Sequence, residues 1–164
     1  MKREADMLKI ANSVNVGPRI LGTSENFLLM ELLNGELIQE WINHIDPNHN
    51  IDIVKEVLLD VLEQCFRLDS IGLDHGELNQ ARRHILIDGK RPRILDFETA
   101  STIRKPSNLS SLCQYIFISR PVAQRIQEIF GRIELDELRI ALAAYKRERD
   151  LESYRRVLHA CHFF

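Results

Sequence analysis

The chain lacks a hydrophobic run long enough to cross a membrane, because no apolar segment approaches the ~18 residues that a transmembrane helix requires. The first residues, Met1–Glu4, precede no apolar core, so we expect no signal peptide. The three cysteines, Cys65, Cys113 and Cys161, lie far apart and form neither a Cys-x-x-Cys pair nor a zinc-binding spacing. We therefore expect free thiols in a reducing compartment, a cytoplasmic location and no membrane association.

The chain also lacks a strong charge of either sign, since its formal net charge is −2 over 164 residues. This balance argues against a general nucleic-acid binder. A local basic stretch nevertheless occupies residues 82–105, and it is interpreted either as a solvated surface or as a patch for a phosphorylated or nucleic-acid partner. Its basic residues are Arg82, Arg83, Lys90, Arg91, Arg93, Arg104 and Lys105.

The first 35 residues predict a small segment of mixed structure. The helical spacing of Met7, Leu8 and Ala11 predicts a helix over residues 3–12, which ends in the turn around Gly17. A short strand is expected over residues 19–22, and the apolar run over residues 27–30 predicts a second, buried strand. A turn at residues 34–35 then marks the boundary with the rest of the chain.

The remainder, residues 36–164, is predicted to be mainly helical. Its clearest helix follows Asp52, the expected N-cap, and ends at Gly72 in a left-handed conformation. A polar loop is expected over residues 46–50 and an irregular one over residues 99–110. Further helices are expected over residues 37–45, 112–118, 122–130 and 135–158, the last with a break near Asp150. The apolar stripe of the clearest helix consists of Val54, Val57, Leu58, Val61, Leu62, Cys65 and Leu68.

Two short apolar runs, residues 85–87 and 93–95, flank the pair Asp88-Gly89. Such a pair between apolar segments is a strong signal for a β-hairpin. In an antiparallel hairpin, the residues before the first strand lie beside the residues after the second. The polar residues that we expect to meet at this end of the hairpin are Glu77, His84, Asp96 and Glu98.

These residue types suit phosphoryl transfer. That reaction needs a divalent cation held against the phosphates and an oriented acceptor hydroxyl, with little covalent help from the protein. Magnesium prefers oxygen ligands, which Asp96 can supply at the end of a strand. Glu77, on the neighbouring loop, can orient or deprotonate an incoming hydroxyl, and Gly76 permits an unusual backbone angle beside it.

The tetrapeptide His75–Leu78, with the sequence His-Gly-Glu-Leu, resembles the His-Gly-Asp-Leu catalytic loop of RIO-type and other small microbial kinases. The tripeptide Asp96–Glu98, Asp-Phe-Glu, resembles their Asp-Phe-Gly motif. The chain looks most like a group of predicted archaeal serine/threonine kinases in which these motifs read His-Gly-Glu-Leu and Asp-Phe-Glu. The resemblance implies an α+β, protein kinase-like fold. Residues 1–35 would form a truncated N-lobe with the regulatory-type helix, the last strands and the hinge, and residues 36–164 a mainly helical C-lobe carrying the β-hairpin.

The resemblance also assigns roles by position. Asp96 becomes the magnesium ligand, and Glu77 stands at the catalytic base, with His75 in the same catalytic loop as its brace. His84 takes the place of a metal-binding asparagine; it either binds the metal or hydrogen-bonds phosphate, because imidazole binds magnesium poorly. The implied cofactors are ATP and Mg²⁺. The remaining nucleotide-binding positions are Glu4, Met30, Glu31 and Leu33.

Two parts of the family's nucleotide site have no counterpart in the chain. None of its seven glycines forms a Gly-x-Gly-x-x-Gly motif, and no strand lysine precedes the helix that contains Glu4. We therefore expect either an N-terminally truncated kinase or a natural short form. The first functional hypothesis is Mg²⁺- and ATP-dependent serine/threonine phosphorylation.

The alternative is a catalytically impaired pseudokinase that acts as a protein-binding scaffold. An incomplete N-lobe would expose apolar side chains around Ile20, Phe27 and Leu29, which would favour dimerisation or a protein partner. A third hypothesis, an RNA- or ribosome-associated module, depends only on the basic stretch and on analogy with RIO proteins.

Overall fold

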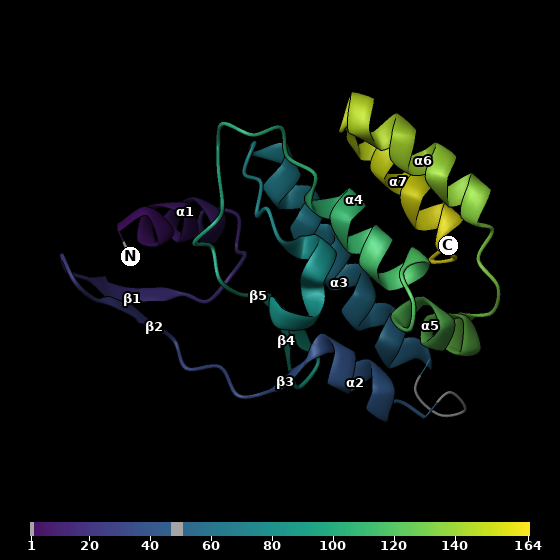
Figure 1. Cartoon of the computed structure of the whole chain (residues 1–164), viewed down its shortest axis with the longest axis horizontal. Coiled ribbons are helices and arrows are strands. Elements are labelled where there is room, and N and C mark those ends of the chain that lie inside the picture. The colour runs from purple at the N-terminus through teal and green to yellow at the C-terminus, as the bar shows by residue number, and fades with distance from the viewer. Residues whose placement is uncertain (1, 47–50) are drawn as a thin grey trace.

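The computed structural model describes residues 2–46 and 51–164 and has an α+β architecture rich in helix (Figure 1). Within these ranges, no helix has both the length and the apolarity to cross a membrane. The strands are β1 (Ile20–Thr23), β2 (Leu28–Met30), β3 (Glu36–Leu37), β4 (Ile85–Asp88) and β5 (Arg91–Ile94). The helices are α1 (Lys2–Asn12), α2 (Ile38–His44), α3 (Ile51–Ser70), the 3₁₀ helix η1 (Leu78–Arg83), α4 (Asn108–Cys113), the π-helical turn η2 (Gln114–Ile118), α5 (Val122–Phe130), α6 (Leu135–Glu148) and α7 (Leu151–Ala160).

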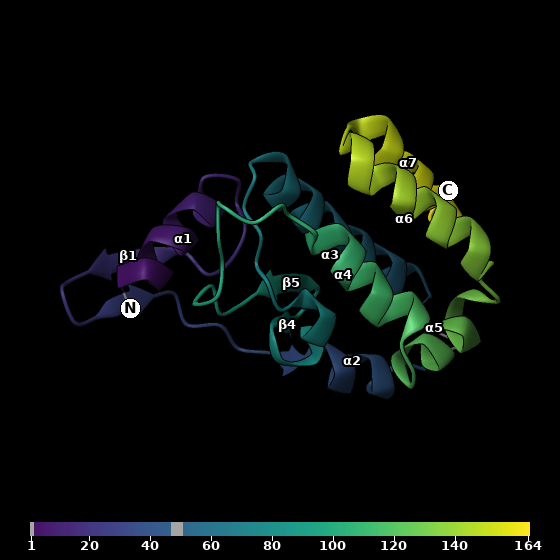
Figure 2. The same ribbon diagram turned by 45° about the horizontal axis from the view of Figure 1, so that its top comes forward.

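The N-terminal elements lie at one end of the elongated molecule (Figures 1 and 2). There α1 lies beside an antiparallel pair of strands, β1 and β2, and residues 31–35 lead from this pair to β3 without helix or strand. In the larger part, α3 contacts both the sheet at β5 and helix α4, while α6 and α7 pack against each other. This arrangement confirms a small mixed segment followed by a mainly helical part.

Helix α3 carries the predicted apolar stripe on one face, and all seven residues of that stripe are buried. Gly72, just after the helix, has φ of +75°, which confirms the left-handed conformation expected there. The predicted cap was wrong, because α3 begins at Ile51 and Asp52 therefore lies in its first turn. The predicted polar loop falls mainly on residues 47–50, which lie outside the described residues.

The predicted hairpin is confirmed as β4 and β5, which pair antiparallel from Ile85 with Ile94 to Asp88 with Arg91. A third strand, β3, pairs with β4 on its other side. Gly35 permits this close approach, because a Cβ atom at that position would collide with the carbonyl oxygen of Ile87. Sequence reasoning missed β3, since a strand of two residues has no measurable periodicity.

The strand predicted over residues 27–30 forms, but the expectation that it is buried was wrong. Sheet β1–β2 has two strands, and its inner side chains, among them Ile20 and Leu28, pack against the core. On its other face Phe27 and Leu29 are 76% and 61% exposed. A continuous apolar run indicates a buried strand only where other elements cover both faces of the sheet.

Helix α4 begins at Asn108, inside the stretch predicted to be irregular. The carboxylate of Asp69, on α3, accepts hydrogen bonds from the backbone N–H groups of Asn108 and Leu109 at 3.0 and 3.2 Å. A tertiary contact therefore caps this helix, and no local motif could reveal it. The break expected near Asp150 is confirmed, because this residue caps α7 in a capping box with Ser153.

Candidate functional site

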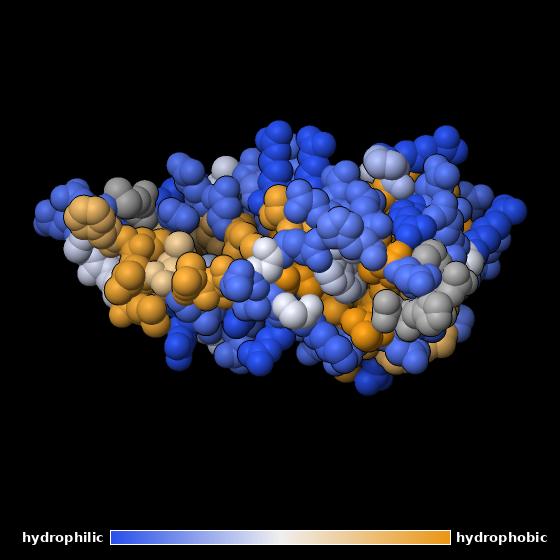
Figure 3. Space-filling view, turned by 90° about the horizontal axis from the view of Figure 1, so that it is seen from below, coloured by the Kyte–Doolittle hydropathy of each residue, from blue (hydrophilic) through white to orange (hydrophobic). Residues whose placement is uncertain are grey.

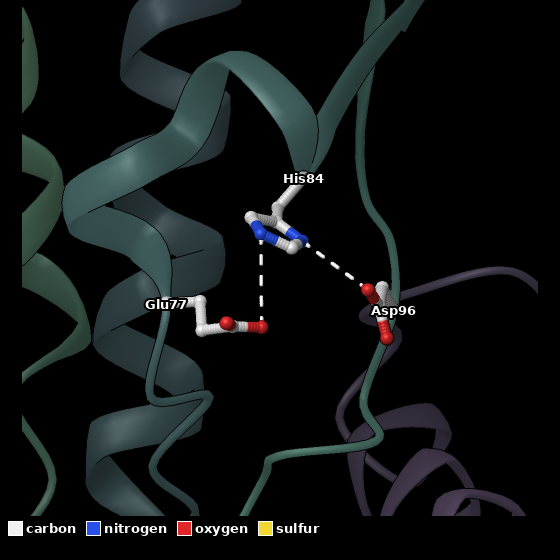
Figure 4. Close-up of side chains that lie close together, drawn as sticks. All are labelled: Glu77, His84 and Asp96. Carbon is white, nitrogen blue, oxygen red and sulfur yellow. Dashed lines mark ion pairs between the residues drawn. The ribbon is translucent and has the colours of Figure 1, made fainter.

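The hairpin brings together residues that are distant in sequence. Beyond the pair Ile85 and Ile94, the Leu95 N–H donates to the carbonyl of His84 at 2.7 Å. This additional backbone hydrogen bond extends the pairing of the hairpin by one residue. It places His84, which follows η1, beside Asp96, which follows β5. Figure 4 shows the His84 ring between two carboxylates: its Nε2 lies 3.7 Å from Glu77 Oε2 and its Nδ1 3.7 Å from Asp96 Oδ2.

Burial differs among the three members of the Glu77–His84–Asp96 cluster. The His84 side chain is 8% exposed, whereas those of Glu77 and Asp96 are 35% and 47% exposed. One ligand atom from each residue lies within 4.8 Å of the others, so the three side chains could hold a small cation once the carboxylates move closer. The expected meeting of these residues is therefore confirmed for three of four, since Glu98 is exposed and outside the cluster.

Asp96 has an uncommon backbone conformation. Its φ is +64°, in the left-handed region that residues other than glycine seldom occupy. The Glu98 N–H donates to Asp96 Oδ1 at 3.4 Å and closes a tight turn around it. The left-handed residue redirects the chain after β5, and Glu98, two residues on, is exposed and outside the cluster. Strained positions of this kind cluster at functional sites.

His75 packs against His84 and holds the strand end that leads to Asp96. It is fully buried, and its Nε2 lies 2.8 Å from the carbonyl oxygen of Leu95, which identifies Nε2 as the protonated nitrogen. Its ring makes edge contacts with His84 and with Phe97, at 5.3 and 5.1 Å between centroids. Burial lowers the pKa of His75, so the neutral ring is favoured. The expected bracing position is thus occupied by a buried imidazole.

Two residues that sequence reasoning missed hold the loop containing Glu77. Thr99 Oγ1 donates to the carbonyl of His75 at 3.0 Å and lies 3.3 Å from Glu77 Oε2. Arg104 donates to the carbonyl of Thr99 at 2.7 Å and to Asp74 Oδ2 at 2.9 Å. The only sequence signal for Thr99 was a hydroxyl side chain three residues after Asp96, and no motif indicated a role for Arg104.

Gly76 lies beneath this arginine. Its φ is +93°, and a side chain would collide with the guanidinium of Arg104, which accounts for glycine between His75 and Glu77. Other residues of the basic stretch form separate ion pairs: Lys90 with Glu56 at 3.7 Å and Arg93 with Glu31 at 3.5 Å. The Lys90 pair is exposed and favours a solvated surface there, whereas the Arg93 pair is mostly buried.

The remaining predicted nucleotide-binding positions are not members of the cluster. Glu31 accepts from the Arg19 N–H at 2.8 Å, and its own N–H donates to the Arg19 carbonyl at 2.9 Å. It lines a cavity of about 450 Å³ that contains no member of the cluster. Met30 packs against the core, and Leu33 is half-buried in the connection to β3. Glu4 is half-buried on α1 and forms no ion pair within the described residues.

Comparisons with known proteins name no activity. No protein-family model matches the chain. It is similar to an uncharacterized protein, MJ1211, of the archaeon Methanocaldococcus jannaschii, with 27% identity over 122 residues. The match spans 74% of this chain and the whole of that protein.

Proposed function

We propose that the chain has a protein kinase-like fold and that the Glu77–His84–Asp96 cluster is a site of Mg²⁺- and ATP-dependent phosphoryl transfer to serine or threonine. The observation that carries this proposal is the convergence of two motifs across the hairpin, with His84 3.7 Å from a carboxylate on each side. Separate segments supply an acid after a strand and an acid on the neighbouring loop, as phosphoryl transfer requires.

The arrangement of the other elements supports the same fold. A helix and two strands precede an extended connection and a helical part, the order expected for the end of an N-lobe, a hinge and a C-lobe. The loop after Asp96 also approaches the first segment, since Arg3 Nη2 donates to the carbonyl of Ala100 at 3.3 Å. A Cβ atom on Gly17 would lie 2.9 Å from the Phe97 ring, so the two parts pack closely.

The side chains divide the work as follows. The carboxylates of Asp96 and Glu77 suit Mg²⁺, which prefers oxygen ligands, whereas the imidazole of His84 does not. When bound, Mg²⁺ would neutralise phosphate charge. Glu77, held by Thr99, would orient or deprotonate the acceptor hydroxyl. His75 fixes the loop by its bond to the Leu95 carbonyl.

Nucleotide binding tests the proposal directly. Millimolar Mg-ATP should raise the melting temperature of the chain, because a ligand that binds the folded state stabilises it. Asp96→Asn should abolish this increase and the transfer of labelled γ-phosphate to a generic protein substrate. The matched control is Asp88→Asn, at the opposite end of the hairpin, which should retain both. A folded wild-type chain without any melting shift would contradict the proposal.

A second candidate function, a protein-binding scaffold, is favoured by one surface. Apolar side chains gather at the N-terminal end of the molecule (Figure 3). The exposed apolar residues of this surface, here called the β1–β2 patch, are Leu21, Phe27, Leu29 and Leu32. Contiguous apolar surface of this kind marks interaction sites. A second copy fits best as the occupant, because two identical apolar faces are complementary about a two-fold axis.

Sedimentation velocity over a range of concentrations tests this candidate. The wild-type chain should dimerise, and Phe27→Ser combined with Leu29→Ser should shift it to monomer. The matched control is Ile103→Ser, since Ile103 is 95% exposed but lies outside the patch. A wild-type chain that stays monomeric at about 100 μM, where association with a Kd of ~1 μM would be nearly complete, would reject the scaffold formed by self-association.

A further inference from the structure

The donor set of the Glu77–His84–Asp96 cluster differs from the set that Mg²⁺ selects. Mg²⁺ takes oxygen ligands at ~2.0–2.1 Å in a nearly octahedral arrangement. Divalent cations of the first transition series, by contrast, accept imidazole nitrogen and carboxylate oxygen together. His84 is therefore the residue that decides which cation the cluster favours.

His84 is held in the position of a ligand. Its side chain is 8% exposed, and its ring is fixed against that of His75. The buried Nδ1 has no hydrogen-bond partner in the part of the chain that the structure describes. The nearest carboxylate oxygen, Asp96 Oδ2, lies 3.7 Å away, which is beyond a hydrogen bond. A buried polar atom without a partner is destabilising, and a bound cation would supply the partner.

Cation binding requires the carboxylates to move while the imidazole stays in place. One ligand atom from each residue lies within 4.8 Å of the others. A cation ~2.1 Å from each ligand requires ligand atoms ~3–4 Å apart. Because Glu77 faces Nε2 and Asp96 faces Nδ1, at least one carboxylate must move toward the nitrogen that binds the cation. Glu77 and Asp96 are partly exposed and can do so by rotating their side chains, while His84 stays in place.

We propose that Glu77, His84 and Asp96 bind a transition-metal cation such as Mn²⁺ in preference to Mg²⁺, through one imidazole nitrogen and two carboxylates. The inference rests on the proposed function for the site's role and changes the favoured cation of that site from Mg²⁺ to Mn²⁺. Binding of the metal alone is nevertheless measurable without nucleotide. Failure of ATP binding with intact Mn²⁺ binding would reject the kinase proposal only, and the reverse result would reject this inference only.

The full chain, stripped of metal with a chelator, is titrated with Mn²⁺ and with Mg²⁺ in the absence of nucleotide. Calorimetry should show one Mn²⁺ per chain, bound about tenfold more tightly than Mg²⁺. Pulsed electron paramagnetic resonance should show coupling of the bound Mn²⁺ to a nitrogen nucleus, which identifies the imidazole. Equal affinities for the two cations, or bound Mn²⁺ without nitrogen coupling, would overturn the inference.

Variants separate ligation from folding. His84→Asn should remove the nitrogen coupling and bring the Mn²⁺ and Mg²⁺ affinities close together. The matched control is His44→Asn, because His44 also pairs with a carboxylate, Glu36, at 2.8 Å but lies outside the cluster. If His84→Asn does not fold, Asp96→Asn decides: Mn²⁺ affinity should fall at least about tenfold, and unchanged affinity would reject the site.

Discussion

The side chain of Asn108 holds the backbone of His75, 33 residues earlier in the chain, by a hydrogen bond of 2.8 Å from the His75 N–H to Asn108 Oδ1. The same amide donates through Nδ2 to Asp69 Oδ1 and to the Leu73 carbonyl, both at 2.7 Å. Helices α3 and α4 are thus joined to the loop that carries Glu77. The position of the candidate site depends on this buried polar network.

Replacing Asn108 by alanine should lower the free energy of unfolding by about 2–4 kcal/mol, because several buried groups lose their partner at once. The groups left without the amide are the His75 N–H, the Leu73 carbonyl and the Asp69 carboxylate. Urea denaturation measures the change. Asn79→Ala is the control, since Asn79 is exposed on η1 and its replacement should change stability little.

Asp69 and Tyr145 provide a prediction about pH. Burial raises the pKa of Asp69, and the hydrogen bond from Tyr145 opposes this, donating to Asp69 Oδ2 at 2.8 Å. Because the folded state binds the Asp69 proton more tightly than the unfolded state, this group's stabilising effect is lost as pH rises through the raised pKa. Tyr145→Phe removes a donor to the ionised carboxylate and should raise that pKa further.

The destabilisation by Tyr145→Phe should therefore be about 1–2 kcal/mol at pH 7 and smaller near pH 4.5, where the carboxyl is more fully protonated. Urea denaturation at the two pH values measures this difference. Tyr154→Phe is the control, since Tyr154 stacks on Phe66 and is not among the described groups that donate to Asp69. A loss from Tyr145→Phe that is equal at both pH values would contradict the assigned coupling.

Gly76→Ala should destabilise the chain by about 1–3 kcal/mol, since its φ of +93° disfavours a side chain. The new methyl group would also displace the guanidinium of Arg104. Gly89→Ala is the matched control, because Gly89 has φ of +64° and its Cβ would meet no atom within 4 Å. Thermal denaturation of both variants measures how much stability each loses, and the difference between the two losses reports on the contact with Arg104. Equal losses of stability would show that backbone strain alone destabilises Gly76→Ala.

The sequence predicted the meeting of His84 and Asp96 because hairpin geometry is a local property. An Asp-Gly pair between two apolar runs determines which residues lie opposite each other, and the register from Ile85 to Asp88 follows from it. The same reasoning failed for Glu98, since it expected every polar residue just after the second strand to meet the residues before the first. Only the structure shows the left-handed φ of Asp96, which redirects the chain there.

Features set by distant partners could not be predicted. The start of α4 depends on Asp69, 39 residues before Asn108, and the loop around Gly76 depends on Arg104, which no motif distinguishes. Exposure of Phe27 followed only from the hypothesis of an incomplete N-lobe, because the apolar run itself predicted burial. Each is a tertiary property, whereas periodicity and turn residues report on local structure.

Glu77→Gln tests the expected role of this carboxylate in phosphoryl transfer. The amide preserves the shape of the side chain but accepts a proton poorly, so turnover should fall by about 10²–10⁴-fold. Steady-state kinetics with labelled ATP and a generic protein substrate measure the change. Glu98→Gln is the control, because Glu98 is exposed nearby and outside the cluster. Turnover that is unchanged in Glu77→Gln would remove Glu77 from the mechanism.

Asn12 fixes the turn between α1 and β1 by three hydrogen bonds of 3.0 Å. Its Nδ2 donates to the carbonyls of Val16 and Pro18, and its Oδ1 accepts from the Ile20 N–H. Asn12→Ala should lower the free energy of opening this segment by about 1–3 kcal/mol, since partly buried backbone groups lose their partners.

Amide hydrogen exchange should therefore accelerate in residues 13–20 of Asn12→Ala, while α6 and α7, at the other end of the molecule (Figure 2), keep their protection. Asn26→Ala is the control, because Asn26 is exposed in the connection between β1 and β2. Uniform acceleration through the whole chain would instead mean that α1 and the helical part unfold as one cooperative unit, so that Asn12 stabilises the entire structure rather than its own turn.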